Sequence, residues 1–139
     1  MAATRKAAGE WHGTLTEGNG RVSLESSGLG TFDVTWAART EEPGGRTSPE
    51  ELIAAAHASC YSMSVSNVLT KAGHPPTTLN TRAEVDFQPG EGITGIRLWV
   101  SGDVPGLDAD GFREAAETAK LACPVSKALS AVPIALTVE

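Results

Sequence analysis

One long, almost uncharged helix is the feature of this sequence that most constrains its fold. Ser48 fits the N-cap of this helix, Pro49 fits its first position, and Glu51 completes a capping box. No charged residue lies between Glu51 and Lys71, and the apolar side chains point in several directions around the axis until the predicted end at about Ala72. A helix that is apolar on every side has to be buried.

The surroundings of this helix have to supply that burial. It is not a convincing membrane span, because polar side chains are scattered through it: His57, Ser59, Ser62, Ser64, Ser66 and Asn67. A small single domain would have difficulty covering the helix on every side, so we expect its remaining face to pack on a second subunit. The sequence therefore predicts an obligate homodimer.

The segment before the helix has the pattern of an antiparallel meander. Three short alternating runs, separated by glycine-containing turns, are expected to be strands: Glu10–Thr16, Arg21–Ser26 and Thr31–Trp36. A polar loop, Thr40–Arg46, should connect the last of them to the helix.

The segment after the helix predicts a hairpin, two helices and a closing strand. Gly73 is a C-cap glycine that ends the long helix. The expected elements beyond it are strands at Thr78–Phe87 and Ile93–Val100, joined around Gln88–Gly92, a helix at Asp108–Leu121, a short helix from Cys123-Pro124 through Leu129, and a strand at Ile134–Val138. No internal repeat is present, and the prediction is one domain, residues 1–139.

Length and charge exclude several classes of protein. A chain of 139 residues can bury a core without disulfides as staples. The formal net charge of −6 argues against a nucleic-acid partner. We found no signal peptide and no apolar stretch of membrane-spanning length, so we expect a cytoplasmic protein without a membrane partner. In that reducing compartment, two cysteines are expected to be transiently oxidised rather than permanently paired.

The two cysteines, Cys60 and Cys123, differ in their local setting. Cys123 precedes Pro124 at a predicted helix start, where free N–H groups favour a thiolate, although a small N-cap or core residue is an equally simple interpretation. Cys60 lies in mid-helix, where apolar burial raises the pKa of a thiol, and such a cysteine is more often a core residue. A functional Cys60 needs a cation from elsewhere.

The nearest candidates to assist Cys60 are Arg39 and Arg46, before the helix, and Glu50 and Glu51 in its first turn. Arginines in polar loops are commonly solvated, and acids in a first turn commonly serve the cap. Glu50 precedes Cys60 by ten residues, or about 15 Å along a continuous helix. If Glu50 serves a Cys60, the two must come from different subunits, so catalysis would require the dimer.

A metal site is not favoured. His57 and Cys60 are three residues apart and could share a helix face, but zinc sites usually need more ligands, so His57 is interpreted as a polar core or interface group. The glycines lack the spacing of a phosphate loop, and no serine lies in a nucleophile-elbow pattern.

Two motifs together resemble the osmotically inducible protein C (OsmC) and organic hydroperoxide resistance (Ohr) family. They are Ser48-Pro-Glu-Glu-Leu-Ile-Ala-Ala-Ala-His-Ala-Ser-Cys60-Tyr-Ser-Met63 and Ala122-Cys-Pro-Val-Ser126, and Ala-Ala-His-Ala-x-Cys is similar to the OsmC branch. The resemblance implies an α+β fold in an intertwined homodimer, with antiparallel sheets wrapped around central helices and active sites at the subunit interface.

The implied activity is a thiol-dependent peroxidase for defence against oxidative or osmotic stress, without cofactor or metal. It would reduce organic hydroperoxides, and hydrogen peroxide less well, to alcohols. In the family's pattern Cys60 is the peroxidatic thiol and Cys123 the resolving thiol. Arg39, with Arg46 as the alternative, and Glu50 would position the nucleophile, and an external dithiol would reduce the resulting disulfide.

Two other interpretations remain open at this point. One is a non-catalytic dimer that binds an apolar ligand and whose thiols only sense oxidation. The other is a structural protein with inert thiols.

Overall fold

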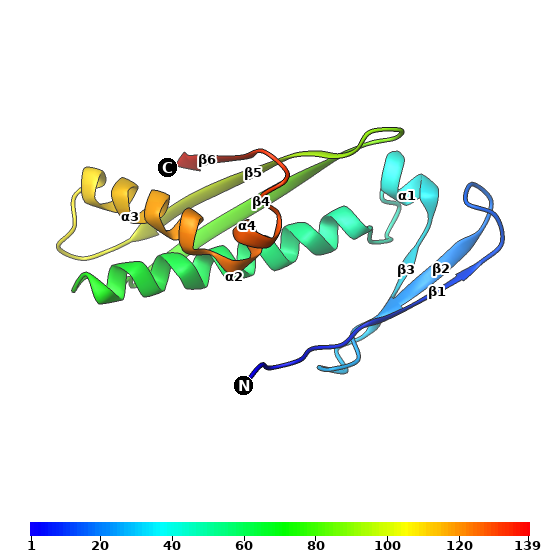
Figure 1. The fold of residues 1–139 in the computed structure, drawn as a ribbon, viewed down its shortest axis with the longest axis horizontal. Coiled ribbons are helices and arrows are strands. Elements are labelled where there is room, and N and C mark those ends of the chain that lie inside the picture. The colour runs from blue at the N-terminus through cyan, green and yellow to red at the C-terminus, as the bar shows by residue number, and fades with distance from the viewer. The chain divides into compact units, whose positions relative to one another are not determined.

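The computed structural model describes all residues, Met1–Glu139, in two compact units, Met1–Pro49 and Glu50–Glu139 (Figure 1). In the first unit, β1 (Ala8–His12), β2 (Asn19–Ser23) and β3 (Thr31–Val34) form an antiparallel sheet in the order β1-β2-β3. The predicted meander is confirmed, but the first two strands start earlier than expected and all three end earlier.

The prediction of a strand through Trp36 was wrong. The chain leaves β3 at Val34 and forms a short helix, α1 (Trp36–Thr40), so Arg39 lies on a helix rather than in a loop. The Thr35 hydroxyl accepts a 3.1 Å hydrogen bond from the Ala38 N–H and caps the helix. This local bond ends the strand pattern that the apolar alternation had indicated.

The second unit contains the predicted long helix, α2 (Pro49–Lys71), which begins at the proline expected for its first position. Gly73 ends it with a φ of 87°, a conformation that is strained for other residues. No helix of the chain is both long and apolar enough to cross a membrane.

A second sheet packs with α2 and has the order β4-β5-β6. β4 (Thr78–Gln88) and β5 (Gly92–Asp103) form the predicted hairpin, with Thr78 opposite Asp103. β6 (Ile134–Val138) has the predicted bounds but pairs in parallel with β5. This sheet is therefore mixed, which corrects the expectation of antiparallel sheets at this edge.

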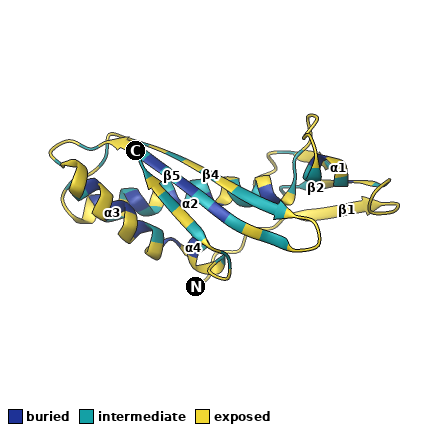
Figure 2. Ribbon diagram, turned by 90° about the horizontal axis from the view of Figure 1, so that it is seen from above, coloured by how far each residue is buried: buried dark blue, intermediate teal, exposed yellow.

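The core of the second unit lies between this sheet and the helices. Leu98 and Val100 are two positions apart on β5, so they share the face that packs on α2 and on α3 (Ala109–Ala122). Figure 2 shows buried positions alternating along β5. The short helix α4 (Pro124–Ala128) follows Cys123, as predicted. Both cysteines are thereby brought to the region where α2, α3 and α4 meet.

The opposite face of the sheet is polar. Arg97 binds two carboxylates on β4, with Nη1 at 2.6 Å from Asp86 and Nη2 at 3.0 Å from Glu84. Arg82 stacks over the Trp99 ring, 4.1 Å from its centroid. These partly exposed groups give the sheet the alternation of apolar and polar faces that is typical of sheets covered on one side.

Candidate active site

Three polar side chains of α2, at residues 57, 61 and 64, form hydrogen bonds with α3 and α4. The Tyr61 hydroxyl donates a 2.8 Å hydrogen bond to the Ala116 carbonyl, and the Ser64 hydroxyl donates one of the same length to the Ala119 carbonyl. His57 Nε2 lies 2.7 Å from the Ser126 hydroxyl oxygen. The spacing places all three on one side of the helix, so the polar residues of this uncharged segment join it to its neighbours.

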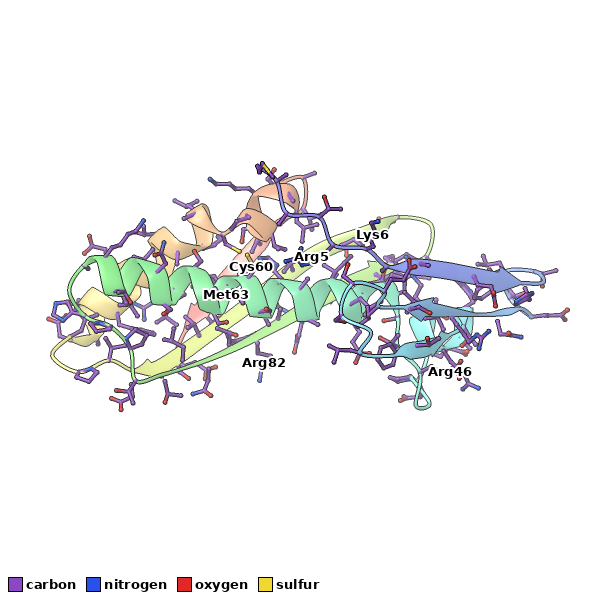
Figure 3. All side chains as sticks on the ribbon, turned by 90° about the horizontal axis from the view of Figure 1, so that it is seen from below. Arg5, Lys6, Arg46, Cys60, Met63 and Arg82 are labelled. Atoms are coloured by element: carbon purple, nitrogen blue, oxygen red, sulfur yellow. The ribbon has the colours of Figure 1, made fainter.

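Cys60 lies on the same side of α2 (Figure 3), and its thiol is near enough to that of Cys123 for each to shift the pKa of the other. Cys60 is partly buried and Cys123 fully buried, and both thiols are free. The Val125 backbone N–H interacts with both sulfur atoms. Two reduced thiols in contact are poised for disulfide chemistry.

The surroundings move the pKa values of the two thiols in opposite directions. Burial raises the pKa of Cys60, the Val125 N–H opposes this, and Cys123 adds to the increase. Burial alone would raise the pKa of Cys123 as well, but the N–H and hydroxyl groups of Ser126, the Cys60 thiol and the Val125 N–H outweigh it and lower this pKa. Within this arrangement Cys123 is the more acidic thiol.

Cys123 is the N-cap residue of α4, as predicted, but its sulfur accepts no cap hydrogen bond of regular geometry. The lowered pKa of Cys123 therefore reflects the electrostatic effect of several nearby donors rather than one ideal bond. None of the groups that act on the Cys60 thiol is a cation. A thiolate at Cys60 thus needs a positive charge in addition to these contacts.

The other predicted site residues lie apart from the thiols along the chain. Glu50 is buried in the first turn of α2, ten residues before Cys60 on the same continuous helix. Arg39 belongs to the first unit, where its guanidinium lies over the Trp36 ring at 5.8 Å. Arg46, also in the first unit, is exposed and donates a 3.4 Å hydrogen bond to the Gly44 carbonyl. The two cysteines are predicted site residues that the structure brings together.

The chain matches the family model described as OsmC-like protein over residues 42–139, which include both cysteines. The protein belongs to the OsmC-like family. It is 41% identical over 134 residues to Peroxiredoxin OsmC of Escherichia coli, with 94% of this chain and 93% of the relative covered. The predicted resemblance is thereby confirmed.

Solved structures agree with this membership. An organic hydroperoxide resistance protein OsmC from Legionella pneumophila has a TM-score of 0.76 and 25% identity, with 99% of both chains covered. The fold is also that of the organic hydroperoxide resistance protein OhrB of Bacillus subtilis, with a TM-score of 0.69, 22% identity, and 96% and 98% of the two chains covered. The predicted α+β fold of the OsmC-like protein is confirmed.

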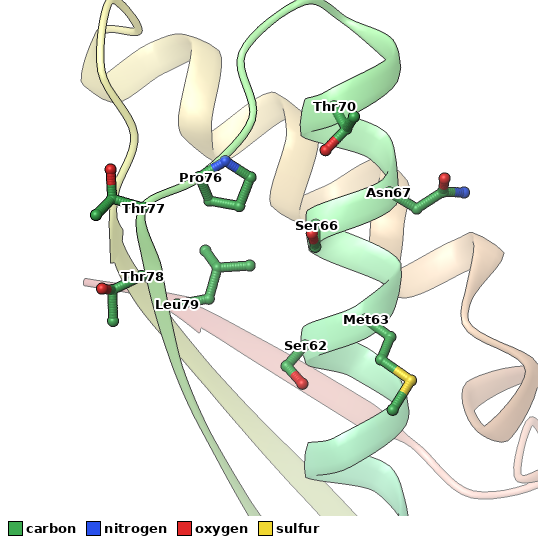
Figure 4. Close-up of a pocket in the computed structure, with 9 residues that line it drawn as sticks. All are labelled: Ser62, Met63, Ser66, Asn67, Thr70, Pro76, Thr77, Thr78 and Leu79. Atoms are coloured by element: carbon green, nitrogen blue, oxygen red, sulfur yellow. The ribbon is translucent and has the colours of Figure 1, made fainter.

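A groove between the second half of α2 and the start of β4 is one of the concave features of the second unit (Figure 4). Its lining consists of Ser62, Met63, Ser66, Asn67, Thr70, Pro76, Thr77, Thr78 and Leu79. None of these side chains titrates near neutral pH, and the groove includes neither cysteine. The reactive groups of this OsmC-like protein therefore lie outside it. No cluster of three or more His, Cys, Asp and Glu side chains suited to a metal was found.

Ser126 and Val125 are site residues that the sequence analysis did not single out. Both follow Cys123 within the short helix, so their N–H groups lie near its sulfur. The signal that could have identified Ser126 is a small polar residue three positions after an N-cap cysteine, where a capping partner is usual. The contact from Ser126 to His57 spans 69 residues and has no such local signal.

Proposed function

We propose that this OsmC-like protein is a thiol-dependent peroxidase that reduces organic hydroperoxides to alcohols in defence against oxidative or osmotic stress. The observation that carries the proposal is the contact between two free thiols whose pKa values are shifted in opposite directions. Family membership and 41% identity to a peroxiredoxin support the same chemistry.

The first step uses Cys60 as the peroxidatic thiolate, an assignment that rests on the family pattern. The thiolate attacks the distal peroxide oxygen, so that an S–O bond forms as the O–O bond breaks. The alkoxide leaves and takes up a proton to become the alcohol, and Cys60 becomes a sulfenic acid. The sulfur is oxidised by two electrons and the peroxide is reduced by two.

Arg39 is proposed to supply the positive charge that Cys60 lacks within its own unit, with Arg46 as the alternative. Glu50 would orient the arginine through a charge-assisted, bidentate pair. Because α2 is continuous from Pro49 to Lys71, Glu50 lies about 15 Å from Cys60 along its own helix. Glu50 of one protomer therefore serves Cys60 of its partner in a homodimer with interfacial active sites.

The second step uses Cys123 as the resolving thiol. Its sulfur forms a bond to the Cys60 sulfur, the S–O bond breaks, and the leaving hydroxide is protonated to water. The proximity of the two free thiols, each of which shifts the pKa of the other, supports this role. An external dithiol, available in a reducing compartment such as the cytoplasm, then reduces the disulfide by exchange.

Replacement of Cys60 tests the proposal. With excess dithiol, the reduced protein should consume cumene hydroperoxide faster than hydrogen peroxide, because Cys60 borders the hydrophobic core and apolar surroundings favour an alkyl group. Cys60→Ser should abolish turnover with both oxidants. Absence of turnover in folded wild-type protein with two free thiols would instead favour a ligand-binding or sensing protein.

Replacement of Cys123 tests the division of roles. Cys123→Ser should consume about one equivalent of cumene hydroperoxide per protomer and then stall, because the sulfenic acid at Cys60 has no partner. Mass spectrometry should find sulfenic or sulfinic acid at Cys60. Sustained turnover by Cys123→Ser at the wild-type rate would exclude a resolving role, and full activity of Cys60→Ser would reverse the assignment.

A further inference from the structure

His57 and Ser126 form a buried polar pair that the proposed reaction does not yet use. His57 is fully buried and Ser126 is 7% exposed, and His57 Nε2 lies 2.7 Å from the Ser126 Oγ. The other ring nitrogen of His57, Nδ1, is buried without a hydrogen-bond partner. A buried polar atom without a partner is costly, so the position of the single ring proton has a large energetic consequence.

The unpartnered Nδ1 fixes the tautomer of His57. Burial lowers the pKa of the imidazole, so the ring is neutral near pH 7 and carries one N–H. A proton on Nδ1 would be a buried donor without an acceptor, which is rarer in proteins than an unfilled lone pair. A proton on Nε2 has the Ser126 oxygen as its acceptor. His57 therefore donates from Nε2–H to the Ser126 Oγ.

This donation determines where the hydroxyl proton of Ser126 points. With its oxygen accepting from His57, Ser126 has its own O–H left to donate, and its hydroxyl is among the groups that lower the pKa of Cys123. Ser126 follows Cys123 by three positions in the first turn of α4, so a chain of hydrogen bonds can run from His57 through Ser126 toward the Cys123 sulfur. Cys60 and Tyr61, both on α2, are the titratable groups that also interact with Cys123.

We propose that His57 is a positioning residue, which acts through the Ser126 hydroxyl to hold Cys123 as a thiolate ready to attack an oxidised Cys60. This inference rests on the proposed peroxidase function for its role in turnover. In the step that it assists, the Cys123 thiolate forms the S–S bond while hydroxide leaves the sulfenic sulfur and is protonated to water. The proton first lost by Cys123 passes to solvent, and the arrangement makes this resolving step faster.

A titration of Cys123 as the sole thiol tests the chain of hydrogen bonds without any peroxide. In Cys60→Ser, the ultraviolet absorbance of the thiolate gives the pKa of Cys123. Adding Ser126→Ala should raise this pKa by about one unit, the size expected when a charged group loses one hydrogen bond. His57→Phe should raise it by less, and His57→Gln should restore it because its amide N–H can replace Nε2–H. The control, Ser130→Ala, changes an exposed serine just beyond α4.

Two further measurements keep the test decisive if a variant fails to fold. In the wild-type protein, ¹⁵N chemical shifts should show the proton of His57 on Nε2, and a proton on Nδ1 would overturn the inference. After one equivalent of cumene hydroperoxide, Ser126→Ala should show an about tenfold lower ratio of disulfide formation to peroxide consumption, since one pKa unit changes the thiolate fraction tenfold. An unchanged pKa of Cys123 in Ser126→Ala would also overturn it.

The outcomes for the two proposals are separable. If wild-type protein consumes no peroxide but the titration and the tautomer are as expected, the peroxidase function fails and the positioning of the Cys123 thiolate stands. If turnover depends on Cys60 but neither Ser126→Ala nor His57→Phe moves the pKa of Cys123, the function stands and the role of His57 fails.

Discussion

Tyr61 shows how single residues fix α2 against α3. It is fully buried, and its hydroxyl donates to the Ala116 carbonyl at 2.8 Å. Tyr61→Phe should lower the free energy of unfolding by about 1 kcal/mol, the net worth of one hydrogen bond. Urea denaturation measures this, with Ser62→Ala as the control, since Ser62 bonds only to Ser59 within its own helix. If Tyr61→Phe loses no more unfolding free energy than Ser62→Ala, the Tyr61 hydroxyl does not contribute to stability.

The same hydroxyl predicts a loss of stability at alkaline pH. Burial, with smaller contributions from the negative charges of Glu117 and Cys123, raises the pKa of Tyr61 above its ordinary value. Between the unfolded pKa of about 10 and the higher folded value, the native state binds more protons than the unfolded state, so stability falls as the pH rises through this range. Tyr61→Phe should therefore show a shallower decline in unfolding free energy between about pH 9 and 11. Parallel declines would contradict this origin.

At the scale of helices and strands, the sequence predicted the elements that are determined by the pattern of neighbouring residues. Uncharged composition and capping residues identified α2, and strict alternation identified the β4–β5 hairpin. The short helix α1 was missed because Phe32, Val34 and Trp36 continue a strand-like alternation, while the Thr35 cap that ends it is a single hydrogen bond. Local patterns also give no direction for β6, whose parallel pairing depends on the packing of α3 and α4 before it.

The candidate site was predictable to a smaller degree. The place of Cys123 before Pro124 indicated a favoured thiolate, but its resolving role and its pairing with Cys60 came from the family resemblance, since 63 residues separate the two in the sequence. His57 was recognised as a buried polar group, and its partner Ser126 was not. Long-range side-chain contacts of this kind are set by how helices pack, which periodicity alone does not specify.

The end of α2 gives a prediction about an element as a whole. Gly73 has a φ of 87°, and the position of a Cβ there would contact nothing within 4 Å. Gly73→Ala should therefore lower stability by about 1 kcal/mol through backbone strain alone. Gly73→Asn should lose less, because asparagine adopts this conformation more readily. Equal thermal stability of the wild-type protein and Gly73→Ala would show that the helix end has moved to relieve the strain.

At the scale of the whole molecule, an uncharged face of α2 remains without a covering element in the second unit. Met63 is 69% exposed, and the nearby Ala55, Ala56 and Ser59 are exposed as well. An exposed apolar strip on a helix without charged residues supports the proposed homodimer, in which a second copy of the chain would cover it.

A charge on this strip should both separate the subunits and abolish peroxidase activity. Met63→Glu places a carboxylate where the proposed dimer would bury it. Sedimentation at micromolar concentration should therefore show a dimer for the wild-type protein and monomers for this variant. Peroxidase activity should fall in parallel, because in the proposed site Glu50 and Cys60 come from different protomers. Thr118→Glu, which adds the same charge at an exposed position of α3, should leave the dimer intact. A wild-type monomer with full activity would contradict both the dimer and the shared site.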